Sequence, residues 1–158
     1  RGAYYSWNAA VRNTQAAAAG EKVQGIAPAG WHIATREEWV FLINNQPDNN
    51  NPAASMRSKQ YWDAAMAPEC NNSFGFNVVS TGYIWTITAG HDIIEGEKWA
   101  SFWTSTEPKE GDEIPWNPSP ADFPNQACVY SFSPSDNGIA YYVYAKYRGY
   151  NVRCVLDD

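Results

Sequence analysis

The first apolar segment of the chain predicts a helix. Residues 4–19 read YYSWNAAVRNTQAAAA, in which alanine, a strong helix former, is the commonest residue. Ser6 is a residue type that accepts hydrogen bonds from the free backbone N–H groups at a helix start, and Gly20 is typical of a helix end. We therefore expect a helix that is capped by Ser6 and stops at Gly20.

A second helix is predicted by a stronger local signal. Thr35 and Glu38 have the spacing of a capping box, in which each side chain satisfies a backbone N–H of the other residue. Trp39, Leu42 and Ile43 follow at the i, i+3 and i+4 spacing of one helical face. The helix is expected to end near residue 44, because residues 45–52 read NQPDNNNP.

The later part of the chain alternates between short apolar runs and turn-forming residues. Runs rich in aromatic or β-branched residues occupy 74–79, 83–85, 99–105, 127–132, 139–145 and 152–155. Gly, Pro, Asn and Ser separate them, which is typical of strands joined by long loops. One such loop, 107–125, holds five prolines. Helices followed by strands predict the α+β fold class, and 158 residues fit a single domain, 1–158.

The charge balance argues against two kinds of partner. Lys and Arg number 11 against 17 Asp and Glu, which gives a net charge of −6. A nucleic-acid-binding surface needs clustered cations, so no nucleic-acid partner is expected. No run of 18 apolar residues is present, so this domain is not expected to insert into a membrane. Aromatic residues make up 15% of the chain, and Tyr and Trp recur at interfaces because they join an apolar body to a polar tip.

The three cysteines give no metal signature. Cys70, Cys128 and Cys154 lack the C-x-x-C spacing that is typical of zinc sites. One disulfide with one free thiol and three reduced thiols are both compatible with the sequence.

Six separated segments together resemble a known family. They are residues 5–7 (YSW), 30–39 (GWHIATREEW), 72–77 (NSFGFN), 82–83 (GY), 102–106 (FWTST) and 150–155 (YNVRCV). In this order they resemble the Fibrobacter succinogenes major paralogous domain, which occurs in exported proteins of Bacteroidetes and Fibrobacteres. The chain departs from the family's pattern at Ala34, where Pro is usual, and in the Pro-rich insertion after Glu107.

The resemblance implies a fold and a location. The family is similar to the C-type lectin-like fold shared with formylglycine-generating enzymes. It implies two helices flanking a small twisted antiparallel sheet, with long loops forming one face. It also implies an exported protein at an extracellular or outer-membrane surface, such as a lipoprotein.

The residues do not favour an enzyme. The formylglycine-generating branch uses a closely spaced cysteine pair, whereas Cys128 and Cys154 lie far apart. A related iron-dependent branch needs three histidines, and this chain has only His32 and His91. His32 is expected to be a hydrogen-bonded structural residue. We therefore predict a non-catalytic domain with no catalytic residues, no cofactor and no resident metal.

Calcium is the one metal that the sequence leaves open. Lectins of this fold often hold sugars through Ca²⁺, which takes six to eight oxygen ligands. Glu107, Glu110, Asp112 and Glu113 could supply some of them. Solvation of a charged loop is the favoured interpretation of these carboxylates.

The tyrosine-rich C-terminal third is the predicted binding face. Residues 140–150 read AYYVYAKYRGY, and alternation in a strand places Tyr142 and Tyr144 on one face and Tyr141 on the other. Both faces cannot bury all these rings, so some are expected to contact a partner, either a glycan or a cell-surface protein. The predicted ligand-binding residues are Tyr130, Tyr141, Tyr142, Tyr144, Tyr147 and Tyr150, with Trp116 and Asn117 from the Pro-rich loop.

Three further hypotheses accompany this prediction. In some relatives with this fold a retroelement mutates adenine-containing codons in the last third of the gene. Tyr, Asn, Ser and Asp, which are abundant between Tyr130 and Asn151, are residue types that such a process yields, so a diversified binding surface is the first hypothesis. A structural tip or stalk module of a surface assembly is a second alternative, which self-association would favour. A divergent formylglycine-generating-type enzyme is a third, which bound copper or activity on a cysteine-containing peptide would favour.

Overall fold

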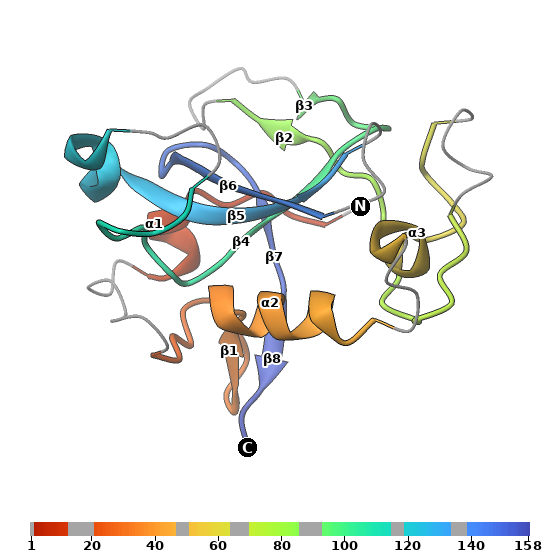
Figure 1. The fold of residues 1–158 in the computed structure, drawn as a ribbon, viewed down its shortest axis with the longest axis horizontal. Helices are drawn as coiled ribbons and strands as arrows, with labels where there is room; N and C mark the ends of the chain where they lie inside the picture. The colour runs from red at the N-terminus through yellow and green to blue at the C-terminus, as the bar shows by residue number, and fades with distance from the viewer. Residues whose placement is uncertain are drawn as a thin grey trace.

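The computed structural model describes residues 2–12, 21–46, 51–63, 70–85, 93–114, 119–133 and 139–158. These residues mix helices and small sheets, which confirms the α+β class (Figure 1). In chain order the elements are α1 (Trp7–Ala10), β1 (Trp31–Ile33), α2 (Arg36–Asn44), α3 (Pro52–Met56), β2 (Tyr83–Ile84), β3 (Ile93–Ile94), β4 (Ala100–Trp103), the 3-10 helix η2 (Pro120–Asn125), β5 (Gln126–Phe132), β6 (Ile139–Ala145), β7 (Asn151–Val152) and β8 (Cys154–Leu156).

The largest sheet has four strands in the order β6-β5-β4-β7. β4, β5 and β6 are antiparallel neighbours, with Phe102 opposite Tyr130 and Tyr130 opposite Tyr141. β7 instead pairs parallel with β4, so the prediction of a purely antiparallel sheet is wrong. The cause is the connection after β6, which crosses the sheet and brings β7 to the far edge of β4 running in the same direction.

Two smaller sheets complete the fold. β1 pairs with β8, so the last strand of the chain lies beside its first (Figure 1). β2 and β3 form a short antiparallel pair, with Tyr83 opposite Ile94.

The first helix is shorter than the sequence predicts. Ser6 caps it as expected, accepting a hydrogen bond from the Ala9 N–H at 3.4 Å, but α1 ends at Ala10. Residues 13–20, where the helix was expected to continue, lie outside the described part. The carbonyl of Ala10 accepts from Ile26 N–H at 2.9 Å, so an incoming loop takes the hydrogen bond that another helical turn would have made. A Cβ on Gly25 in that loop would lie 2.2 Å from the same carbonyl oxygen.

The second helix is confirmed, and two helical segments were not predicted. α2 begins after the capping box of Thr35 and Glu38, and it buries Trp39. α3 starts at Pro52, whose missing N–H costs nothing at a first helical position, and Asn51 caps it. With η2, the described residues hold four helical segments rather than the two that the resemblance implies.

Apolar side chains cover both faces of the large sheet. On one face Trp39 of α2 stacks on Phe102 and Tyr130, with ring centroids 5.6 and 5.4 Å away. On the other face, Trp103 and Tyr150 meet edge to face at 4.7 Å within a second core. Figure 1 shows α2 on one side of the sheet and the β2–β3 pair on the other. The second face is the one that carries the candidate site.

Candidate ligand-binding site

The tyrosines of β6 divide between the two faces of the sheet, as strand alternation predicts. Tyr141 points toward α2: its ring lies 5.5 Å from that of Tyr130, and its hydroxyl lies 3.0 Å from Cys128 Sγ. Tyr142 and Tyr144 stack on each other at 5.5 Å and belong to the opposite face. Only the second pair therefore lies on the side of the β2–β3 pair.

Two of the predicted binding tyrosines are core residues. Tyr130 is 5% exposed and Tyr150 is 1% exposed. Burial raises the pKa of Tyr130 to about 12 and also raises that of Tyr150, so both phenols stay protonated. Tyr130 packs in the core between the sheet and α2, whereas Tyr150 lies at the wall of a pocket.

The second face of the sheet opens into an aromatic pocket of about 410 Å³. That volume is within the range of about 300–1,000 Å³ that small-molecule sites occupy. Its walls come from β2, β4, β5 and β6, from the segments that follow β2 and β3, and from the turn after β6. The lining residues, which we call the aromatic pocket, are Tyr83, Trp85, Glu95, Trp99, Ser101, Ser131, Tyr144, Arg148 and Tyr150.

Two serine hydroxyls form the polar part of the sheet surface in this pocket. Ser101 and Ser131 face each other across β4 and β5, and their Oγ atoms are 2.8 Å apart. The two residues are 2% and 1% exposed. A buried hydroxyl is costly unless it has a hydrogen-bond partner, so each serine satisfies the other.

Arg148 is held between two aromatic rings of the pocket. Its guanidinium carbon lies 3.9 Å from the ring centroid of Trp85 and 4.4 Å from that of Tyr144. One of its amino groups donates to the Tyr150 hydroxyl at 3.4 Å. These contacts fix the rings and bring a positive charge to the pocket.

Glu95 contributes the negative charge of the pocket lining, and its carboxylate lies 3.9 Å from the ammonium of Lys98. It is a non-glycine residue in the left-handed region, with φ of 54°. Its carbonyl accepts from the N–H groups of Lys98 and Trp99, both at 3.1 Å, which holds this turn in place. The pocket thus offers aromatic surfaces, two hydroxyls and one charge of each sign.

The remaining predicted residues do not line the aromatic pocket. Tyr141 faces α2, and Tyr142 reaches the pocket only through its stack on Tyr144. Tyr147 is 56% exposed and lies beside Lys146 and Pro124, in a different hollow. Trp116 and Asn117 lie outside the described residues.

Of the nine lining residues, only Tyr144 and Tyr150 are among the predicted ligand-binding residues. The sequence marked Trp85 and Trp99 only as members of apolar runs and Tyr83 also as part of the GY segment shared with the family, and it gave no signal for Glu95 or the serines. Gly82 was the one hint: its φ is 70°, and a Cβ there would lie 2.2 Å from the Ile94 carbonyl oxygen. The pocket depends on that close approach between β2 and β3.

His32 has the structural role that was predicted for it. It is 1% exposed, and its ring nitrogens lie 2.6 Å from Asp157 and 2.7 Å from Glu38. Burial opposes ionisation of Glu38, but the N–H and hydroxyl of Thr35 and the contact with His32 together lower its pKa. His32 therefore ties the last strand to the start of α2.

The acidic loop is engaged in ion pairs. Asp112 lies 2.9 Å from Arg36, and Glu107 pairs with Lys146. Among the described residues no three His, Cys, Asp or Glu side chains are grouped as metal ligands would be. Two of the four carboxylates considered for calcium thus have cationic partners already.

Of the two cysteine alternatives, the structure has the one with three reduced thiols. Cys70 and Cys128 are buried and Cys154 is partly buried, without a disulfide among them. Burial raises the pKa of the Cys128 thiol to about 12, which keeps it protonated and unreactive.

Within the described part of the chain, no helix has the length and apolar character to cross a membrane.

Fold and pocket together define an α+β domain with an aromatic pocket on the face of its large sheet opposite α2. The family model of the Fibrobacter succinogenes major domain matches residues 1–156, so the chain belongs to that family. Comparison with curated proteins and with solved structures gave no significant match.

Proposed function

We propose that this chain is an exported, non-catalytic adhesion domain on a bacterial cell surface that binds glycans in the aromatic pocket. The observation that carries the proposal is the exposed ring of Trp85, which is 51% accessible and is held in place by Arg148 at 3.9 Å. A large accessible aromatic surface that is fixed before binding favours association, because little side-chain entropy is lost.

The composition of the pocket suits a sugar. The flat, half-exposed ring of Trp85 can stack on the apolar face of a pyranose, where its C–H groups lie. Ser101, Glu95 and Arg148 supply hydrogen-bond donors and acceptors for the hydroxyls at the ring edge. An aromatic wall with a few polar groups is the usual composition of a small-ligand site.

Two finer features belong to the same proposal. The pairing of β1 with β8, which brings the last strand beside the strand that precedes α2, supports a C-type lectin-like architecture. Residues 130–151 supply four of the nine pocket residues, which supports a binding surface diversified by a retroelement. On this proposal the codons of Tyr144 and Arg148 vary among sister genes, whereas Tyr150 is constant because it is buried.

A glycan array with purified domain, run with calcium and with a chelator, tests the proposal. For any hit, isothermal titration calorimetry compares Trp85→Ala and Tyr144→Ala with Tyr147→Ala, an exposed tyrosine outside the pocket. Loss of a central aromatic contact costs about 1–2 kcal/mol, so Kd rises about five- to thirtyfold for the pocket variants alone.

The other outcomes decide against parts of the proposal. Equal weakening by Tyr147→Ala would place the site on the turn after β6 rather than in the pocket. An array without hits, followed by recovery of a cell-surface protein that Trp85→Ala no longer binds, would replace the glycan with a protein partner. Binding that is lost in chelator would add calcium to the site.

A further inference from the structure

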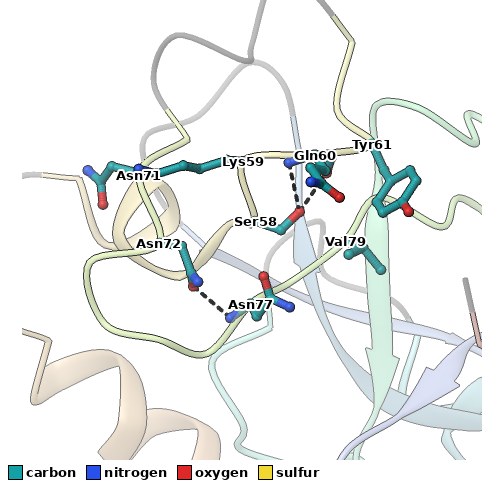
Figure 2. A pocket seen from close by; sticks show the side chains of 8 residues that line it. All are labelled: Ser58, Lys59, Gln60, Tyr61, Asn71, Asn72, Asn77 and Val79. Atoms are coloured by element: carbon teal, nitrogen blue, oxygen red, sulfur yellow. Dashed lines mark hydrogen bonds between the residues drawn. The ribbon is translucent and has the colours of Figure 1, made fainter.

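A second pocket lies beside α3 and has a different chemistry. Figure 2 shows it between the segment after α3 and the loop 71–79. Its volume is about 530 Å³. The lining residues, which we call the amide pocket, are Ser58, Lys59, Gln60, Tyr61, Asn71, Asn72, Asn77 and Val79.

Hydrogen bonding within the loop leaves this pocket rich in donors. The Oδ1 of Asn71 accepts from Ser73 N–H at 2.8 Å, and the Oδ1 of Asn72 accepts from Asn77 N–H at 2.8 Å. Because a backbone N–H can only donate, the atom facing it in each amide must be the oxygen. The NH₂ groups of Asn71 and Asn72 are therefore the parts of these side chains that remain to donate to a ligand.

The charge of the pocket is opposite to that of the chain. Among the described residues that line it, Lys59 alone is charged and none is a carboxylate, although the whole chain carries −6. Figure 2 shows the Lys59 side chain extending toward Asn71. An ammonium beside amide donors favours an acceptor-rich, negatively charged ligand.

The pocket is built before any ligand arrives. Tyr61, Asn72 and Asn77 are non-glycine residues with φ of 71°, 50° and 57°. Such conformations cost about 1–3 kcal/mol each where the side chain does not favour them, and they persist where the surroundings fix them. The N–H groups of Asn71 and Asn72 donate to the Ala54 carbonyl at 3.1 and 3.3 Å, which fixes the loop to α3.

We propose that the amide pocket binds the carboxylate-bearing end of an acidic saccharide. Lys59 and the NH₂ groups of Asn71 and Asn72 bind the carboxylate. Asn77 and Gln60 are placed to bind sugar hydroxyls, and the ring of Tyr61, which is 53% exposed, offers a stacking surface. A simple inorganic anion would leave most of these amides and the ring unused. The site shares no lining residue with the aromatic pocket and does not rest on the function proposed above.

The test is a titration of the ¹⁵N-labelled domain with trigalacturonic acid, followed by NMR. Binding shifts the side-chain NH₂ signals of Asn71 and Asn72, whereas the methyl-esterified trisaccharide, which has no charge, leaves them unmoved. Asn72→Asp keeps the oxygen that accepts from Asn77 N–H and replaces the donor with a negative charge. It weakens binding at least about tenfold, as expected for loss of a charge-assisted hydrogen bond.

Matched variants locate the binding on the molecule. Asn8→Asp makes the same charge change on α1 and leaves binding intact, as does Trp85→Ala in the aromatic pocket. Lys59→Gln weakens binding, whereas Lys109→Gln, which changes an exposed lysine elsewhere, does not. If Asn72→Asp fails to fold, this pair of variants shows whether the saccharide binds in the amide pocket. Equal binding of acid and ester, or shifts confined to residues outside the pocket, would overturn the proposal.

Discussion

The pair of serines in the aromatic pocket allows a prediction with a defined size. Ser101 and Ser131 bond to each other at 2.8 Å, and both are at most 2% exposed. Changing one to Ala removes a hydrogen bond worth about 0.5–1.5 kcal/mol and leaves the other hydroxyl unsatisfied, at about 1–3 kcal/mol. Water from the pocket can reach that hydroxyl, so we expect about 1–1.5 kcal/mol for either single change.

The double variant should cost less than the sum of the two. With both hydroxyls gone no polar group is left unpaired, and the methyl groups of two alanines fit the same space. We expect the Ser101→Ala, Ser131→Ala double variant to be destabilised by no more than about 1 kcal/mol, so that the coupling between the sites is at least about 1 kcal/mol.

Urea denaturation of the four proteins in this cycle measures the coupling. Parallel glycan titrations then tell whether the hydroxyls also contact the ligand, because the double variant keeps its stability but loses polar contacts. Additive free energies of unfolding, within about 0.3 kcal/mol, would refute the reasoning, since independent sites add.

Two other substitutions test the construction of the fold and the pocket. The pKa of Glu38 lies below its ordinary value of 4.5, because the hydrogen bonds from Thr35 and the contact with His32 outweigh the effect of burial. The ionised carboxylate therefore stabilises the folded protein above about pH 4.5, and this stabilisation disappears as pH falls through the folded-state pKa. In urea denaturation at pH 3–7, Glu38→Gln should therefore lose stability at pH 7 and approach the unmodified protein at pH 3; a constant difference would contradict this. Gly82→Ala should destabilise the folded protein by at least about 1–2 kcal/mol and weaken glycan binding. The reason is that the new Cβ would lie 2.2 Å from the Ile94 carbonyl oxygen, at a φ of 70° that alanine rarely adopts. An unchanged midpoint of thermal unfolding would contradict this prediction.

Local signals in the sequence predicted local structure well. The capping box of Thr35 and Glu38 lies within four residues, and α2 begins there as expected. The end of α1 was not predictable in this way. It is set by Gly25 and Ile26, which lie fifteen or more residues beyond Ala10 and reach its carbonyl through the path of the loop. A helix-forming sequence alone could not reveal that competing hydrogen bond.

The aromatic pocket shows the same limit for function. Strand alternation separated Tyr141 from Tyr142 and Tyr144, which the register of β5 and β6 bears out. Strand alternation does not tell which face of the sheet is covered by a helix. In the structure, Trp39 from α2 covers the face that carries Tyr141. Trp85 lies at the pocket because its neighbour Ile84 is bonded to Gly149, 65 positions further along the chain. The Ile84 N–H donates to the Gly149 carbonyl at 2.9 Å.

Strained backbone coincides with both pockets. Five non-glycine residues in the described part of the chain have positive φ; three line the amide pocket and a fourth, Glu95, lines the aromatic pocket. A strained loop persists only if the structure beneath it is rigid. Here β4 and β5 supply that rigidity, with Trp103 fully buried between α1 and Tyr150. Because Trp85 is half exposed at the pocket rim, changing it should remove less packing than changing the fully buried Trp103. On the function proposed above, ligand specificity can therefore change at the rim while the buried residues beneath it stay the same.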